Sequence, residues 1–344
     1  MGTATRLNFF LPTTLAALAL SASAGVAIAA PAQTTDAGVT RIILLGTNGG
    51  PRPYPLRAEP ANLLVVNGTP YLIDAGEGVA GQIAQAGFAL PKVRTIFITH
   101  HHIDHDAGLS PLIALTWFDT AWDNQSLPPV QIYGPPATRF LTRAALDYLS
   151  VSERIFRAGV PALQPAATMF SAHDIHANGE FYRDSRISVT AAENTHFHSK
   201  SGSAATGRDM SFSYRFDTPQ GSVVFTGDTG PSPAVTALAR NADVLVSEVC
   251  LCDTPADVKP TATSQASMRT AAAIDQTENF HMHNEHLTPE EVGKLATAAH
   301  VRVVILTHFV PGKTTDPTTF TAGVMRYFSG PVIPGKDLLE YDLR

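Results

Sequence analysis

The sequence predicts a mixed α/β protein. Short apolar runs bounded by Gly, Pro, Asn or Asp alternate with longer segments of helical periodicity. Hydrophobic residues make up 44% of the 344 residues, which is sufficient for the core of one large domain. A histidine-rich stretch directly follows one of the apolar runs, and it indicates a metal site at the end of a strand. Periodicity alone does not select an architecture within this class.

The first half of the chain is expected to begin with strands and then to alternate strands with helices. Asn67-Gly68 is a two-residue signal for a hairpin, and Gly87 ends the first predicted helix. The strands are expected at residues 40–45, 62–66, 70–73, 93–99 and 128–133. The helices are expected at residues 78–87, 109–117 and 137–149.

The second half repeats this alternation after a segment with a looser pattern. Residues 150–184 contain scattered Pro, Ala and aromatic residues. We expect them to form an insertion that sets specificity, covers the pocket as a lid or contacts a second subunit in a homodimer. Strands are then expected at residues 187–191, 211–216, 222–226, 244–248 and 301–307, and helices at 233–240 and 289–299.

Residues 1–29 have the composition of a secretory signal peptide. Arg6 precedes an Ala- and Leu-rich run, and Ala27-Ile-Ala29 supplies small residues for cleavage. The run is too short to span a bilayer comfortably, and no other stretch is apolar over a sufficient length. We therefore expect one domain, residues 30–344, in the periplasm or secreted, without a membrane anchor.

The formal net charge of the chain is −6. A mildly acidic protein lacks the basic field that nucleic-acid binding normally requires, so no nucleic-acid partner is expected. Cys250 and Cys252 are the only two cysteines. A bridge between cysteines so close in sequence closes a strained ring, so packing or a free thiol is favoured over a disulfide.

The histidine-rich stretch at residues 99–108 reads Thr-His-His-His-Ile-Asp-His-Asp-Ala-Gly. In an extended segment residues i and i+2 point to the same side, so His100 and His102 can hold one ion. The turn that follows directs Asp104 and His105 toward a second point. Imidazole and carboxylate together suit zinc, iron or manganese better than calcium or magnesium.

This stretch resembles the signature Thr-His-x-His-x-Asp-His-x-x-Gly of the metallo-β-lactamase superfamily, and every specified position matches. Four further motifs follow the family's order, around Asp74, His196, Asp228 and His308. The resemblance implies the family's αββα sandwich, in which two mixed β-sheets are flanked by helices. It also implies two divalent metal ions, with Zn²⁺ favoured and Mn²⁺ or Fe²⁺ as alternatives.

The family pattern, carried over residue by residue, assigns seven metal ligands. The first ion is assigned to His100, His102 and His196. The second ion is assigned to Asp104, His105 and His308, with Asp228 bridging the two. The resemblance implies a metal-bridged hydroxide as nucleophile, with Asp104 counted among the catalytic residues and Asp74 supporting the metal loop.

Two segments resemble the tRNA-maturing (tRNase Z) branch of the superfamily. Residues 244–248 form an apolar run that ends in Glu248, and His286 stands just before a predicted helix. The resemblance implies that Glu248 orients His286 and that His286 protonates the leaving group. Thr288 and Glu291 have the spacing of a capping box, which independently predicts where that helix begins.

The chain also departs from the tRNase Z branch. The interval between His196 and Asp228 is too short for that branch's tRNA-gripping arm, and it contains few basic residues. The predicted signal peptide and the Gly-rich loop at residues 45–50 are more similar to exported relatives grouped with arylsulfatases and phosphodiesterases. tRNA processing is therefore not expected.

The sequence thus predicts an exported dinuclear-metal hydrolase of small anionic esters, either aryl sulfates or phosphodiesters. A lactonase or a β-lactamase would use the same metal site, although the Glu248–His286 pair has no evident role in a β-lactamase. Two other classes stay open: an iron-dependent oxidoreductase on the same scaffold, and a non-catalytic binding protein. The binding protein is disfavoured because all seven ligands are present.

Overall fold

The computed structural model describes residues 38–197, 209–251, 280–310 and 316–343. The chain divides into two compact units, residues 1–32 and 33–344, and every described residue belongs to the second. The expected signal peptide lies outside the described residues and stays a prediction from the sequence. Within the described residues, no helix combines the length and the apolar character needed to cross a bilayer.

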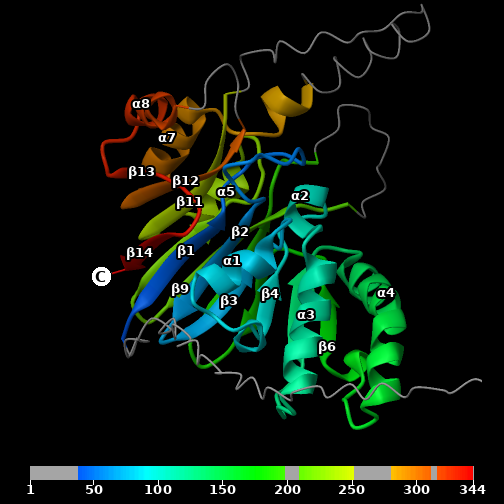
Figure 1. Cartoon of the computed structure of the whole chain (residues 1–344). Coiled ribbons are helices and arrows are strands. Elements are labelled where there is room, and N and C mark those ends of the chain that lie inside the picture. The colour runs from blue at the N-terminus through cyan, green and yellow to red at the C-terminus, as the bar shows by residue number, and fades with distance from the viewer. Residues whose placement is uncertain (1–37, 198–208, 252–279, 311–315, 344) are drawn as a thin grey trace, which may run out of the picture. The chain divides into compact units, whose positions relative to one another are not determined.

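Two seven-stranded β-sheets lie face to face (Figure 1). The first sheet is antiparallel from β14 to β3 and parallel from β3 to β6. Its order is β14 (Leu339–Leu343), β1 (Thr40–Gly46), β2 (Ala61–Val66), β3 (Thr69–Ile73), β4 (Thr95–Phe97), β5 (Val130–Gly134) and β6 (Phe170–Asp174).

The second sheet is parallel from β13 to β10 and antiparallel from β10 to β7. Its order is β13 (Val332–Pro334), β12 (Val303–Val310), β11 (Val244–Cys250), β10 (Gly221–Phe225), β9 (Phe212–Thr218), β8 (Ser188–Glu193) and β7 (Gly179–Arg183). Both sheets are therefore mixed, as the family resemblance implies.

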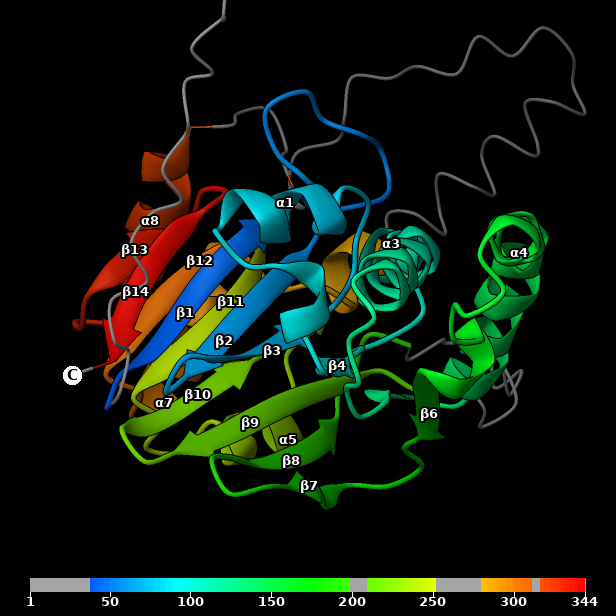
Figure 2. The same ribbon diagram turned by 60° about the horizontal axis from the view of Figure 1, so that its bottom comes forward.

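Helices cover the outer face of each sheet (Figure 2). The first sheet carries α1 (Val79–Gln85), α3 (Leu109–Trp122) and α4 (Thr138–Gly159). The second sheet carries α5 (Pro233–Leu238), α7 (Pro289–Ala298) and α8 (Pro317–Met325). Shorter turns occur at η1 (Leu90–Lys92), α2 (Ile103–Asp106) and η2 (Ala166–Thr168). The expected αββα sandwich is confirmed.

Three apolar layers hold these elements together, and β1 shows how one strand serves two of them. Ile42 and Leu44 enter the layer between the sheets, whereas Ile43 and Leu45 enter the layer beneath the helices. Successive side chains of a strand point to opposite faces, so a strand buried on both faces is apolar throughout. The continuous apolar runs in the sequence therefore mark strands in the middle of the sandwich.

The segment at residues 150–184 contains more regular structure than its sequence pattern suggests. Its first ten residues complete α4, which was expected to end at residue 149. Its later residues form β6 and β7, the edge strands of the first and second sheets. The segment thus carries the chain from one sheet to the other, and its expected role as a lid stays a prediction.

Cys250, the last residue of β11, is fully buried and disulfide-bonded. The preference for packing or a free thiol is therefore wrong for Cys250. Cys252 lies outside the described residues.

Candidate metal centre and active site

The predicted site residues come from both sheets and meet where strands of each sheet end. His100 and His102 follow β4, and Asp104 and His105 belong to α2, which comes next. The second sheet supplies the others: His196 follows β8, Asp228 follows β10, Glu248 lies in β11 and His308 in β12. Loops at the carboxyl ends of parallel strands lie along one edge of a sheet, which explains how distant motifs converge.

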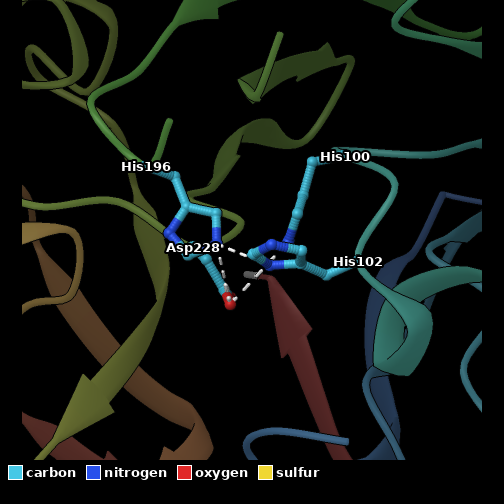
Figure 3. A group of neighbouring side chains, drawn as sticks. All are labelled: His100, His102, His196 and Asp228. Carbon is cyan, nitrogen blue, oxygen red and sulfur yellow. Dashed lines mark hydrogen bonds and ion pairs between the residues drawn. The ribbon is translucent and has the colours of Figure 1, made fainter. Parts of the chain in front are cut away.

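The structure brings His100, His102, His196 and Asp228 into one group, whose potential ligand atoms all lie within 4.8 Å of one another (Figure 3). The Nδ1 atom of His102 lies 2.9 Å from the Nε2 atom of His196. The Oδ2 atom of Asp228 lies 3.7 Å from that Nε2 atom and 3.9 Å from Nε2 of His100. These are the residues assigned to the first ion, together with the bridging aspartate.

A second group consists of Asp104, His105, Asp228 and His308. Nε2 of His105 lies 3.2 Å from Oδ1 of Asp228, and Nε2 of His308 lies 3.1 Å from Oδ2. Nε2 of His308 also lies 3.3 Å from Oδ2 of Asp104, which accepts a hydrogen bond from the Gly50 amide. Asp228 is thus shared by the two groups: its Oδ2 atom lies near His196 and His308, and its Oδ1 atom lies near His105. Ligation by these seven residues stays a prediction.

Hydrogen bonds at the far ring nitrogens orient three of the histidines. Nδ1 of His196 donates to the Glu285 carbonyl at 2.8 Å, and Nδ1 of His105 donates to Asp74 at 2.9 Å. Nδ1 of His100 lies 3.1 Å from the Thr99 hydroxyl. Because a carbonyl oxygen only accepts, the neutral His196 ring keeps an Nε2 lone pair that faces the centre. Burial acts against the charge on His105, but Asp228, Asp74 and Asp104 outweigh it and raise its pKa, so a metal ion must displace a proton from its Nε2 atom.

Several atoms at the centre are buried without a hydrogen-bond partner among the described residues. They are Nε2 of His100, Nε2 of His105 and Oδ1 of Asp228, of which the last two form a 3.2 Å ion pair without hydrogen-bond geometry. An unsatisfied buried polar atom costs about 1–3 kcal/mol, so such atoms rarely converge without a ligand. Imidazole nitrogens and carboxylate oxygens are the ligands of zinc and similar divalent ions, so the residues fit the metals that the fold implies.

Asp74, at the end of β3, holds the metal loop in place. Its carboxylate accepts from the Thr99 amide at 2.7 Å, from the Thr99 hydroxyl at 3.0 Å and from His105. Its own backbone has φ of 62°, in the left-handed region that aspartate tolerates better than most residues. One buried carboxylate thus connects Thr99, at the start of the loop, to His105.

The two groups differ in their electrostatics. Burial lowers the pKa of His100 and His196 well below the ordinary value, which keeps both rings neutral, the form that binds metals. Burial also acts on His308, but Asp228 and Asp104 outweigh it and raise its pKa to about 10. Without metal, the second group therefore holds a proton that a cation must displace.

Glu248 and His286 form a buried pair beside the second group. Nδ1 of His286 lies 2.6 Å from Oε2 of Glu248, and the Thr229 amide donates to Oε1 at 2.6 Å. Burial lowers the pKa of His286, but the Glu248 carboxylate outweighs burial and raises it above the ordinary value. The pair therefore has the geometry and charge of an oriented general acid.

A further histidine, His281, has an acidic partner that was not predicted from the sequence. Nδ1 of His281 lies 2.5 Å from the carboxylate of Glu285, and its Nε2 lies 3.3 Å from Nε2 of His286. His281 belongs to a helical turn at residues 280–284, and i, i+4 pairs on a helix face each other. That spacing is the signal that could have revealed Glu285.

Comparison with known proteins agrees with this geometry. Residues 69–309 match the model of the Beta-lactamase superfamily domain. A ribonuclease Z of Mycobacterium avium (strain 104) is 28% identical over 302 residues, covering 86% of this chain and 96% of that protein. Among solved structures, the metallo-β-lactamase fold protein YhfI from Bacillus subtilis matches with a TM-score of 0.62 and 16% identity, covering 88% of this chain and 99% of YhfI. The short form of human tRNase Z matches with a TM-score of 0.55 and 20% identity, over 88% and 99% of the two chains.

These relatives overturn one expectation. Nucleic acid was excluded as a partner because the chain is acidic and the interval between His196 and Asp228 is short. Proteins named ribonuclease Z align with most of this chain, so net charge and a missing arm do not separate it from nucleic-acid enzymes. The exclusion is therefore wrong. The match over residues 69–309 establishes that the chain belongs to the metallo-β-lactamase superfamily, as one of its metal-dependent hydrolases.

Proposed function

We propose that this hydrolase cleaves phosphodiesters, with His286 as the acid that protonates the leaving oxygen. The observation that carries the proposal is the buried Glu248–His286 pair at 2.6 Å, within reach of the ligand group that contains His308. The relatives named ribonuclease Z support the same ester class. Aryl sulfates, the other class expected from the sequence, have no such support.

The ligand groups would hold divalent cations through His100, His102, His196 and Asp228 on one side and through Asp104, His105, Asp228 and His308 on the other. Such ions supply Lewis acidity, which polarises phosphoryl oxygens and makes water acidic enough to react near neutral pH. Zinc is favoured by the donor set, and manganese or iron would also suit it.

The chain's own residues determine where the proton is delivered. The Glu248 carboxylate can only accept, so Nδ1 of His286 carries a hydrogen and the ring is fixed in one orientation. Its Nε2 atom, 3.3 Å from Nε2 of His281, is then the one that carries the transferable proton. Burial disfavours the imidazolium, but the Glu248 carboxylate stabilises it and raises the pKa of His286, so the ring can donate its Nε2 proton to the departing alkoxide.

The test compares three substrates on metal-loaded protein: bis(p-nitrophenyl) phosphate, p-nitrophenyl sulfate and a precursor tRNA with a 3′ trailer. We expect chelator-sensitive turnover of the phosphodiester and no comparable turnover of the sulfate. Cleavage of the precursor tRNA would mean that the chain also acts on RNA, the substrate class in the name of its relatives called ribonuclease Z. Failure of both phosphodiesters, with metal content verified, would refute the proposal and bring lactones and β-lactams forward.

A further inference from the structure

A cavity of about 400 Å³ lies beside the first ligand group. His102 forms part of its wall, so whatever enters the cavity lies next to the candidate metal centre. Phe197, Met210, Pro136 and Ala137 supply an apolar surface. A cavity of this size, mostly apolar with a few polar groups, is typical of small-molecule sites.

Phe197 is the aromatic wall of this cavity, and its position is fixed by the candidate ligands. Its ring centroid lies 5.0 Å from that of His102, 5.6 Å from that of His100 and 5.2 Å from that of His196. The ring meets His102 and His100 at 80° and 73°. Three neighbours thus hold a half-buried phenyl ring at the cavity wall, where it can stack on a flat group.

Ala137 provides a second, independent indication of a ligand site. It lies at the entrance to α4 with φ of 86°, a conformation that residues with a side chain rarely adopt. Residues held in such conformations cluster at ligand sites, where the surrounding structure maintains them. Because the side chain of Ala137 is a single methyl group, it occupies little of the cavity.

The charges in the cavity restrict what can enter. Asp209 and Glu285 line it, and no lysine or arginine occurs among its described lining residues. The Glu285 side chain is turned to His281, whereas Asp209 is exposed. Within the described residues, a second phosphate would therefore be repelled by these carboxylates, whereas an uncharged ring would not be.

We propose that this cavity binds a planar, uncharged aromatic group that is esterified to the phosphate held at the metal centre. A nucleobase-bearing terminal nucleoside and a simple aryl group share this chemistry. Phe197 stacks on the ring, and Asp209 excludes groups that carry a further phosphate. The inference rests on the proposed phosphodiesterase function, which it deepens by naming the class of the ester group.

The test measures binding by calorimetry on metal-loaded protein, with methyl phosphate, phenyl phosphate and 1,4-phenylene bisphosphate as probes. We expect phenyl phosphate to bind about tenfold more tightly than methyl phosphate, since stacking on one aromatic side chain contributes roughly that much. Phe197→Leu should remove most of this preference. Phe140→Leu is the matched control, because Phe140 is exposed on α4, and it should keep the preference.

The bisphosphate tests the charge argument. The bisphosphate should bind the wild-type protein more weakly than phenyl phosphate does. In Asp209→Asn, the difference in affinity between the two ligands should be smaller. Equal affinities for phenyl and methyl phosphate, or a preference that survives Phe197→Leu, would overturn the inference even if phosphodiesters are hydrolysed. A preference that depends on Phe197, found without any phosphodiester turnover, would uphold the pocket and refute only the proposed reaction.

Discussion

The Nε2 atoms of His281 and His286 lie 3.3 Å apart, and each ring turns its Nδ1 atom to a glutamate. Both glutamates can only accept, so both Nδ1 atoms carry hydrogens and the two Nε2 atoms face each other. A contact of this length is favourable when one proton lies between them. The side chain of His281 is 31% exposed, whereas that of His286 is 5% exposed. The buried His286 is therefore in contact with a histidine that is partly exposed to solvent.

This arrangement predicts that His286→Gln reduces kcat by about 10²–10⁴-fold for diesters with a poorly acidic leaving alcohol, the range for loss of a general acid. The loss should be smaller for p-nitrophenol, which leaves without protonation. His283→Gln, an exposed change on the same turn, is the matched control and should leave both rates unchanged. Equal losses for the two leaving groups would contradict the role of His286 as acid. His281→Gln should show the same leaving-group dependence with a smaller loss.

The contacts of Asp74 predict a defect in metal binding. Asp74→Asn keeps the shape of the side chain and tolerates the positive φ, but it weakens the bonds that hold Thr99 and His105. Loss of such a supporting group typically lowers metal affinity about 10- to 100-fold. Competition with a chelating dye measures this affinity. Asp106→Asn, which alters a contact to His101 in the same loop, should leave it nearly unchanged.

The shared position of Asp228 predicts an effect on metal stoichiometry. Asp228→Asn should lower occupancy of both ligand groups, whereas His308→Gln should lower occupancy of one, because only Asp228 belongs to both. Elemental analysis after gel filtration distinguishes these outcomes. Loss of a single ion in both variants would argue against Asp228 as a bridge.

The raised pKa of His308 predicts that metal affinity depends on pH. Its pKa is about 10 in the metal-free protein, because Asp228 and Asp104 stabilise the imidazolium. A cation must displace that proton, so binding should release protons, and apparent affinity should rise as pH increases from 6 to about 9. Calorimetry in buffers of different ionisation enthalpy measures the release. If the heat of metal binding were the same in all buffers, no proton would be released, and the prediction would be wrong.

The predicted signal peptide has a direct test. If cleavage follows Ala29, the exported protein begins at Ala30, and Edman sequencing or intact mass determines this. A cell fraction in which the protein retains residues 1–29 and stays in the cytoplasm would contradict the export prediction.

The sequence by itself determined the local features of the site. The stretch at residues 99–108 fixes which side chains share a face over a few positions, because strand periodicity and the following turn are local properties. The strand-end positions of Asp228 and His308 could be predicted in the same way. The two ligand groups of the structure contain the same residues that the motif pattern assigns.

Only the tertiary structure determined the long-range relationships. The looser pattern at residues 150–184 concealed β6 and β7, because edge strands are less apolar and pair with partners far away in sequence. The cavity beside Phe197 combines residues from four separate connections, and Glu285 reaches the centre through its backbone carbonyl as well as its side chain. Apart from the i, i+4 spacing of His281 and Glu285, these contacts depend on how the two sheets pack, which no local pattern in the sequence encodes.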